Sequence, residues 1–380
     1  MDHNTDESIG TTPCRTAIDQ FSPGAAVLQI TPFGSGHIHD TFLARILDRG
    51  SERLLILQKI NKTVFQEPDH LMDNLMRITS FLRRKIAEAG GDPERETLTY
   101  LPAQDGRAYF LDPSGEYWRC CLFIGNSVSF DKTDDPDVFY QSALAFGRFQ
   151  QLLSDFPVGS LYEPIKGFHD TAARLKALRQ AVGEDVCGRA SSVGKEIDFF
   201  LERTHLAAAF ADLSPGGAIR LRVTHNDTKL NNVLFDKDTL RAVCVVDLDT
   251  VMPGLAMNDF GDAVRHGANT AEEDETDLGR VQLDLDLFKA FAEGFLAGCG
   301  GSLTDEEVHL LPAGAMVISY ELGMRFLTDH LQGDVYFKTH RPDHNLDRAR
   351  VQIALLQDME RKSTEMERVI DRLRHVHPRQ

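Results

Sequence analysis

One polar loop, at residues 224–232, constrains the fold of this chain more than any other segment. Three of its residues, His225, Asp227 and Asn232, have the spacing H-x-D-x-x-x-x-N. A further carboxylate, that of Asp247, follows fifteen residues after Asn232. Short apolar runs at 233–235 and 242–246 predict two paired strands between Asn232 and Asp247. The fold must therefore return Asp247 to the end of the strand pair where the loop lies.

This spacing is typical of a phosphoryl-transfer site. Such a site needs a carboxylate that orients the attacking hydroxyl and takes its proton, together with oxygen ligands that hold Mg²⁺ against the nucleotide phosphates. Asp227 fits the first role, and Asn232 with Asp247 fits the second. The sequence therefore predicts ATP as co-substrate, Mg²⁺ as cofactor, and catalysis by positioning and charge neutralisation.

Three other interpretations stay open at this point. In the first, the loop serves only to reverse the chain, because Asp and Asn favour turns. Asp247, Asp249 and Thr250 also match the D-x-D-x-T pattern of haloacid-dehalogenase-type phosphatases, in which the first Asp is the nucleophile. That pattern normally opens its fold, whereas 246 residues precede it here. A nucleotide-binding module without catalysis would bind Mg²⁺-ATP but release no ADP in response to an acceptor.

Bulk composition narrows the class of protein. With 380 residues, of which 42% are hydrophobic, the chain is long enough for two lobes. The 41 basic and 58 acidic residues give a formal charge of −17, which argues against nucleic acid or an anionic membrane as partner. Six cysteines without C-x-x-C spacing, a polar N-terminus and the lack of a long apolar run predict a cytoplasmic enzyme with reduced thiols. We expect a monomer.

The first third of the chain predicts a small, β-rich, nucleotide-binding lobe at 21–124, after a polar leader at 1–20. Apolar alternation predicts strands at 25–31, 40–47, 54–60, 98–101, 107–111 and 117–124, and helical spacing predicts one helix at 69–89. A loop with Gly34, Ser35 and Gly36 joins the first two strands, where a kinase flap covers the phosphates. An ordinary hairpin turn explains the two glycines as well.

From residue 129 the pattern is mostly helical, and 125–128 is predicted to be a hinge. Helical spacing is found at 138–156, 170–182, 195–213, 283–297, 305–331 and 345–373. Phe123 and Ile124, directly before the hinge, are predicted to contact the nucleotide base. The expected fold class is α+β, as in protein kinases: a small antiparallel β-sheet lobe with one helix and a larger helical lobe at 129–380, with ATP in the cleft between them.

Through the catalytic spacing and Asp247, the chain resembles the aminoglycoside-phosphotransferase-like small-molecule kinases. More narrowly, it resembles the N-acetylhexosamine 1-kinases. That resemblance rests on longer segments: GSGHIHDTF at 34–42, LQKIN at 57–61, DLDTVMPG at 247–254, DFGD at 259–262, ELGMRFL at 321–327 and GDVYF at 333–337. Membership of a family does not by itself determine the substrate.

The resemblance implies how the reaction would run. Asp227 would orient the anomeric hydroxyl of N-acetylglucosamine or N-acetylgalactosamine toward the γ-phosphoryl group, and Lys59 would neutralise the nucleotide phosphates. Lys59 has an alternative as a solvated lysine at a strand end. For Asp249, a second metal contact and a hydrogen bond within its loop are both open.

The resemblance also implies a sugar site formed by His37, Arg325 and Tyr336. Each residue has an alternative in which it serves the fold alone. His37 would cap a turn beside the glycines, and Tyr336 would belong to the core with a satisfied hydroxyl. Arg325 would pair with Asp329, one turn along its helix.

Two departures from related kinases bear on these roles. Protein kinases pair the strand lysine with a helix glutamate, whereas the usable acid in the helix at 69–89 is Asp73. The glycine loop has Ser35 and His39 where closer sugar kinases are expected to have asparagines. The nearest alternative acceptor is therefore an aminoglycoside, choline, a plain sugar or another small alcohol.

Overall fold

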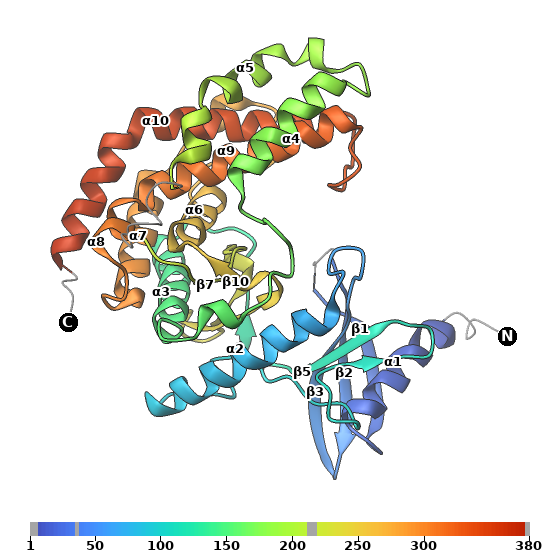
Figure 1. Cartoon of the computed structure of the whole chain (residues 1–380). Helices are drawn as coiled ribbons and strands as arrows, with labels where there is room; N and C mark the ends of the chain where they lie inside the picture. Colours follow the sequence, from blue (N-terminus) through green and yellow to red (C-terminus); the bar gives the residue numbers. More distant parts are fainter. Residues whose placement is uncertain (1–6, 35–37, 211–218, 377–380) are drawn as a thin grey trace. The chain divides into compact units, whose positions relative to one another are not determined.

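The computed structural model describes residues 7–34, 38–210 and 219–376, which divide into two compact units. The first unit comprises the chain up to Ser127 together with Leu161–Ile165 and Val246–Val251, and the second unit comprises the remainder. In the described ranges an antiparallel sheet dominates the first unit, and helices dominate the second (Figure 1). The predicted α+β class is confirmed.

The first unit is built on a five-stranded antiparallel sheet with the strand order β1-β2-β3-β5-β4. Its strands are β1 (Ala26–Pro32), β2 (Asp40–Asp48), β3 (Ser51–Lys59), β4 (Phe110–Leu111) and β5 (Tyr117–Leu122). The helix α2 (Pro68–Glu88) lies where helical spacing predicts it. Residues 98–101 are not a full strand: Tyr100 makes an isolated bridge to Cys121, because the following Pro102 has no N–H to extend the pairing.

The polar leader predicted at 1–20 is helical where the structure describes it, from Glu7 onward. Glu7–Phe21 forms the helix α1. Four of its residues, at helical spacing, are buried against one face of the sheet: Cys14, Ala17, Ile18 and Phe21. The sequence pattern hides this helix because Pro13, which usually breaks helices, lies within it and polar residues surround the four apolar positions.

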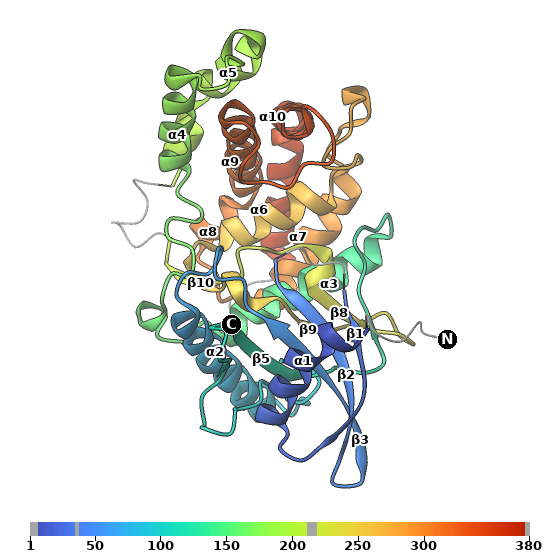
Figure 2. The same ribbon diagram turned by 90° about the vertical axis from the view of Figure 1, so that its right-hand side faces the viewer.

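The second unit is mostly helical (Figure 2). Its α-helices in the described residues are α3 (Pro136–Leu152), α4 (Thr171–Glu184), α5 (Gly194–Glu202), α6 (Ala256–Gly267), α7 (Leu285–Cys299), α8 (Asp305–His309), α9 (Leu311–Gln332) and α10 (His344–Val376). The pairs α3 with α7 and α9 with α10 pack side by side. Glycines permit the first pair to approach closely, because a Cβ added to Gly147 would lie 2.3 Å from the carbonyl oxygen of Phe295.

Most of the predicted helices are confirmed, with shifted ends. The helix predicted at 195–213 stops at Glu202, and its last three residues lie outside the described residues. The helix predicted at 305–331 is divided at Leu310, since Pro312 starts a new first turn. Helix α6 was not predicted, because buried polar residues interrupt its apolar face: Asn258, Asp259, Asp262 and Arg265.

Short strands frame the polar loop in the second unit. β7 (Arg222–Thr224) pairs with β10 (Met252–Gly254) just before it. After it, β8 (Val233–Asp236) and β9 (Ala242–Val245) form the predicted antiparallel hairpin, with Val233 opposite Val245. The two-residue strand β6 (Ser127–Val128), at the boundary of the units, continues that sheet. In the part of the chain that the structure describes, no helix has the length and apolarity to cross a membrane.

Candidate active site

A buried carboxylate of α6 fixes the backbone of the polar loop. Asp259 accepts hydrogen bonds from the N–H groups of His225 and Asn226, at 2.9 and 2.7 Å. Gln150 donates to the same carboxylate at 2.6 Å. Burial raises the pKa of Asp259 above its ordinary value, although these contacts act to lower it. Asn226 has a φ of 65°, which non-glycine residues rarely adopt unless their surroundings hold them there. The loop is therefore held in one conformation just before Asp227.

Both carboxylate oxygens of Asp227 have a partner. Lys229 Nζ lies 2.9 Å from Oδ1. The side-chain amide of Asn232 donates to Oδ2 at 3.1 Å and to the carbonyl oxygen of Asp227 at 2.8 Å. The charge of Asp227 raises the pKa of Lys229, so the amine stays protonated. The structure brings the predicted pair Asp227 and Asn232 together and adds Lys229, which its position two residues after Asp227 could have indicated.

Asp247 lies in the first unit, two residues after β9 and directly before the 3-10 turn Leu248–Thr250. Its backbone is left-handed, with φ 56° and ψ 56°, a conformation that costs a non-glycine residue about 1–2 kcal/mol. Asn74 of α2 donates to the carbonyl oxygen of Val251, after the turn, at 3.3 Å. The rest of the first unit therefore holds the loop that carries Asp247.

The donor chemistry of Asn232 and Asp247 fits Mg²⁺. The amide nitrogen of Asn232 faces Asp227, which leaves its side-chain oxygen as an acceptor, and Asp247 supplies a carboxylate. Mg²⁺ prefers oxygen ligands and takes one or two from the protein, with the remainder from phosphates and water. The described residues contain no group of three or more His, Cys, Asp or Glu side chains arranged for a metal ion. A bound Mg²⁺ would neutralise phosphate charge.

The predicted phosphate-binding lysine is paired within the sheet. Lys59 ends β3, and its Nζ lies 2.7 Å from Asp40 Oδ2 on β2. The hydrogen bond to Asp40 raises the pKa of Lys59. Asp73 of α2 pairs with Arg77, at 3.4 Å. The described residues therefore do not form the ion pair between strand lysine and helix acid that protein kinases use, and the nucleotide role of Lys59 stays a prediction.

The other predicted nucleotide residues are only partly described. Gly34 has a φ of 79°, which favours glycine. The rest of the predicted flap, Ser35 and Gly36, lies outside the described residues, and so does the predicted sugar ligand His37. The Phe123 ring meets Phe33 edge-on at 5.8 Å, and Ile124 is buried. Contact of Phe123 and Ile124 with a nucleotide base stays a prediction.

Arg325 of α9 lies among three aromatic rings of the second unit. Its guanidinium carbon is 5.4, 5.8 and 5.4 Å from the ring centres of Phe168, Tyr336 and Phe337. Such contacts hold a cation without using its N–H donors. Among the described residues Arg325 has no hydrogen bond and no ion pair. Its donors therefore remain available to a ligand.

The alternative partner of Arg325, Asp329, has another role. Its carboxylate accepts hydrogen bonds from three consecutive N–H groups, those of Val335, Tyr336 and Phe337, at 2.9, 2.8 and 2.9 Å. Asn345 donates to it at 2.9 Å. Asp329 thereby folds the chain after α9 so that Tyr336 reaches Arg325. Tyr336 is 65% exposed and is not a core residue.

A half-buried histidine and a buried glutamate connect α9 to the polar loop. Glu321 accepts a hydrogen bond from Thr171 at 2.6 Å and lies 2.9 Å from His169 Nδ1. The other ring nitrogen of His169 is 3.4 Å from the carbonyl oxygen of Asn226. Burial acts to lower the pKa of His169, but Glu321 outweighs it and raises that pKa. Sequence reasoning missed this pair because no motif relates two residues 152 positions apart.

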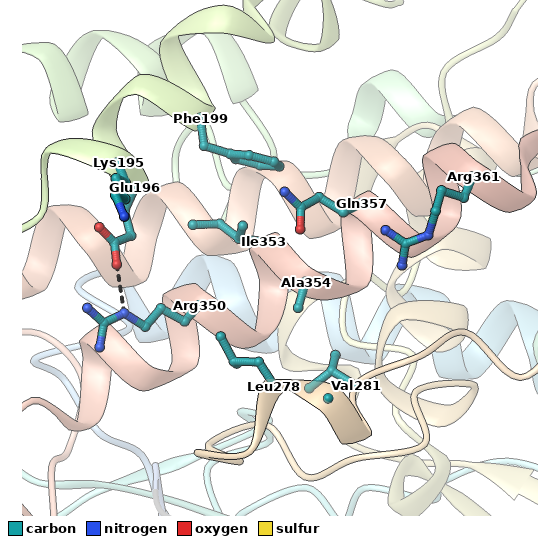
Figure 3. Close-up of a pocket in the computed structure, with 11 residues that line it drawn as sticks. Lys195, Glu196, Phe199, Leu278, Val281, Arg350, Ile353, Ala354, Gln357 and Arg361 are labelled. Atoms are coloured by element: carbon teal, nitrogen blue, oxygen red, sulfur yellow. Dashed lines mark hydrogen bonds and ion pairs between the residues drawn. The ribbon is translucent and has the colours of Figure 1, made fainter.

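A groove of about 480 Å³ lies elsewhere in the second unit, between α5, the 3-10 turn Leu278–Arg280 and α10 (Figure 3). Its wall is partly apolar, with Phe199 and Ile353, and an ion pair of 2.7 Å joins Arg350 to Glu196. None of the predicted site residues lines this groove. It is therefore distinct from the candidate active site.

Comparisons with known proteins agree with this fold. A family model described as "Phosphotransferase enzyme family" matches residues 29–297. An aminoglycoside phosphotransferase from Alicyclobacillus acidocaldarius is 12% identical, with 95% of both chains covered and a TM-score of 0.55. A choline kinase from Cryptosporidium parvum Iowa II is 12% identical, with 90% of this chain and 92% of that chain covered and a TM-score of 0.53. At these identities the solved structures show the fold alone.

The findings do not support the haloacid-dehalogenase-type alternative. Asp247 follows a strand of an antiparallel hairpin, and the family model that matches is that of phosphotransferases. Asp249, the acid/base in that alternative, is bound by both terminal nitrogens of Arg119. Its carboxylate is only 3% exposed and is therefore enclosed within the fold, unlike that of the half-buried Asp227.

Proposed function

This chain belongs to the phosphotransferase enzyme family, and we propose that it transfers the γ-phosphoryl group of ATP to the anomeric hydroxyl of an N-acetylhexosamine. The products would be the sugar 1-phosphate and ADP. The observation that carries the proposal is the Asp227 carboxylate, which Lys229 and Asn232 hold in a loop fixed by Asp259. A carboxylate so held is suited to receive a hydroxyl proton.

In the proposed reaction the sugar oxygen forms a bond to the γ-phosphorus while the bond from that phosphorus to the leaving ADP oxygen breaks. Asp227 accepts the proton of the hydroxyl as it attacks. Lys229, which stays protonated beside Asp227, offsets negative charge at that point. Because the transition state of phosphoryl transfer is loose, these residues act by position and charge and no side chain is phosphorylated. Asn232 and Asp247 would hold Mg²⁺.

The surroundings of Arg325 favour a neutral acceptor. A guanidinium with available donors would repel an aminoglycoside or a choline ammonium group, whereas it suits hydroxyl and acetyl oxygens. The exposed ring of Tyr336 offers an apolar face to a sugar ring. Glu321 and His169 link this part of α9 to the loop that carries Asp227. Arg325 and Tyr336 are therefore the proposed sugar-binding residues, and His37 is proposed with them from the resemblance alone.

The test is ADP release with ATP and Mg²⁺ over a panel of acceptors. We expect acceleration by N-acetylglucosamine or N-acetylgalactosamine, and none by choline or aminoglycosides. Asp227→Asn should lower turnover by about 10²–10⁴-fold, because the proton acceptor is lost, while ATP binding stays close to that of the unaltered protein. Asp238→Asn, in the exposed turn between β8 and β9, is the matched control. Full turnover of Asp227→Asn, or acceleration by cationic acceptors alone, contradicts the proposal.

A further inference from the structure

Two adjacent strands place two cations on opposite faces of the sheet in the first unit. Gln58 of β3 pairs with Arg119 of β5, and the next pair is Lys59 with Trp118. Since successive residues of a strand face opposite sides, Arg119 and Gln58 share one face and Lys59 and Trp118 share the other. Trp118 is packed in the cluster formed with α1. Lys59 therefore belongs to the α1 face, and Arg119 is a buried cation of the opposite face.

Arg119 uses its whole guanidinium inside the first unit. Both terminal nitrogens donate to Asp249, one to each oxygen, and the second contact is 2.7 Å long. Its Nε donates to Gln58 Oε1 at 2.9 Å, and Gln58 donates onward to Thr41 on β2 at 3.0 Å. Arg119 and Asp249 are 2% and 3% exposed. A fork-shaped pair of this kind fixes orientation as well as distance.

His39, at the end of the glycine loop, makes the third side-chain contact with Asp249. Its Nε2 lies 2.8 Å from Asp249 Oδ2. Its Nδ1 accepts the backbone N–H of Asn61 at 3.0 Å, so the ring proton that remains belongs to Nε2 and is donated to Asp249. The His39 ring also stacks on Phe65 at 5.3 Å. The residues just before β2 and just after β3 are thus tied to the turn that contains Asp249.

These contacts make Asp249 a structural anchor for the turn that follows Asp247. Three donors contact its two oxygens and the residue is 3% exposed, which favours the structural interpretation of Asp249 over a second metal contact. Asp247, two residues earlier, has the left-handed backbone, a conformation that costs about 1–2 kcal/mol and that contacts in its surroundings offset. Asn74 holds the carbonyl oxygen of Val251 on the far side of the same turn. The turn is therefore clamped after Asp247 at two points.

We propose that Arg119, Asp249 and His39 are positioning residues that hold Asp247 in the orientation required for Mg²⁺-nucleotide binding. The inference deepens the proposed function and rests on it, because it assumes that Asp247 is a metal ligand. It assigns the buried ion pair of this fold to Arg119 and Asp249, where protein kinases use the strand lysine and a helix glutamate.

The test measures nucleotide affinity rather than turnover. Calorimetry gives the Kd of ADP for the full chain with Mg²⁺ and with EDTA. Asp249→Asn should weaken binding at least about tenfold with Mg²⁺, since a shift of the ligand by a fraction of an ångström is enough to impair octahedral coordination, and less than about twofold in EDTA. Arg119→Lys keeps the charge but loses the fork, and it should give a smaller loss of the same kind.

The matched control is Glu307→Gln, because Arg222 and Glu307 form an equally buried fork of 3.0 and 2.6 Å in the second unit. It should leave the Mg²⁺ dependence unchanged. His39→Phe keeps a ring beside Phe65 and removes the donor, so it tests the inference if Asp249→Asn does not fold, and about a threefold loss with Mg²⁺ is expected.

An equal loss with Mg²⁺ and with EDTA, or a loss no greater than that of Glu307→Gln, overturns the inference and leaves the proposed function standing. Two further results distinguish the positioning role of Asp249 from the proposed function. If the unaltered chain binds ADP no more tightly with Mg²⁺ than with EDTA, the metal role of Asp247 and the positioning role of Asp249 are both wrong. The proposed function is wrong only if neither N-acetylglucosamine nor N-acetylgalactosamine accelerates ADP release.

Discussion

The two units each contain a half-buried or buried arginine beside residues proposed to act in the reaction, and the two arginines differ in how their donors are used. Arg119 in the first unit is bound by Asp249 and Gln58 through both ends of its guanidinium. Arg325 in the second unit is held by three aromatic rings and has no ion pair among the described residues. The first arrangement fixes a loop, and the second leaves donors for a ligand.

The difference arises from the acids that lie near each arginine. Among the residues that the structure describes, Asp249 forms ion pairs only with Arg119 and His39, so it is available for the fork with Arg119. Glu321 stands four residues before Arg325 on α9, but His169 and Thr171 already occupy its carboxylate. Asp329 stands four residues after it and binds backbone N–H groups. An arginine is therefore available for binding when the fold has assigned its nearest acids elsewhere.

The greatest change in kinetics is expected from Arg325→Met. The substitution removes a charged donor but keeps an apolar side chain against the rings, so the KM for the sugar should rise about 10–100-fold, as for a lost hydrogen bond to a charged group. The KM for ATP should change little. Arg84→Met is the control, since Arg84 lies over the Phe81 ring at 4.7 Å but is 60% exposed. An unchanged sugar KM would show that Arg325 serves the fold alone.

A smaller effect is expected from Asp329→Asn. The neutral amide weakens the hydrogen bonds to the N–H groups that place Tyr336, so the sugar KM should rise about threefold to tenfold through loss of position. Steady-state kinetics with varied sugar provide the measurement. Asp284→Asn is matched, because Asp284 accepts two consecutive N–H groups at 2.8 and 3.0 Å at the start of α7. An equal change in both variants would mean a general loss of stability.

The smallest effect is expected for the pair of His169 and Glu321. This pair occupies the Glu321 carboxylate, which would otherwise be near enough in sequence to pair with Arg325. The pKa of His169 is raised above its ordinary value of 6.5, so its contribution to stability is complete below pH 6.5 and is lost as the pH rises through the raised pKa. Burial acts to raise the pKa of Glu321, but His169 lowers it below 4.5, so its contribution is lost as the pH falls through that lowered value.

His169→Gln should therefore lower the melting temperature more at pH 6 than at pH 9, by about 2 °C. Thermal unfolding followed by circular dichroism at both values is the measurement. His309→Gln, at an exposed position on α8, should show no such difference. The same loss at pH 6 and pH 9 would mean that the contact of His169 with Glu321 contributes as a neutral hydrogen bond.

Much of the architecture could be predicted because its signals are local. Alternation predicts β2 and β3, helical spacing predicts α2 and α9, and the loop spacing indicates Asp227 with Asn232. The missed elements carry weak local signals. Helix α6 has its polar residues buried, among them Asp259, which no periodicity of apolar residues can indicate.

Local signals in the sequence were sufficient to predict the catalytic spacing, the class of fold and the candidate acids and cations. Which of these charges meet depends on contacts between segments that are far apart in the chain. Arg119 and Asp249 lie 130 residues apart, and His169 and Glu321 lie 152 apart. A buried charge is stable only beside a partner. Packing between distant segments determines which residue that partner is. This packing binds Arg119 to a loop and leaves Arg325 without an ion pair among the described residues.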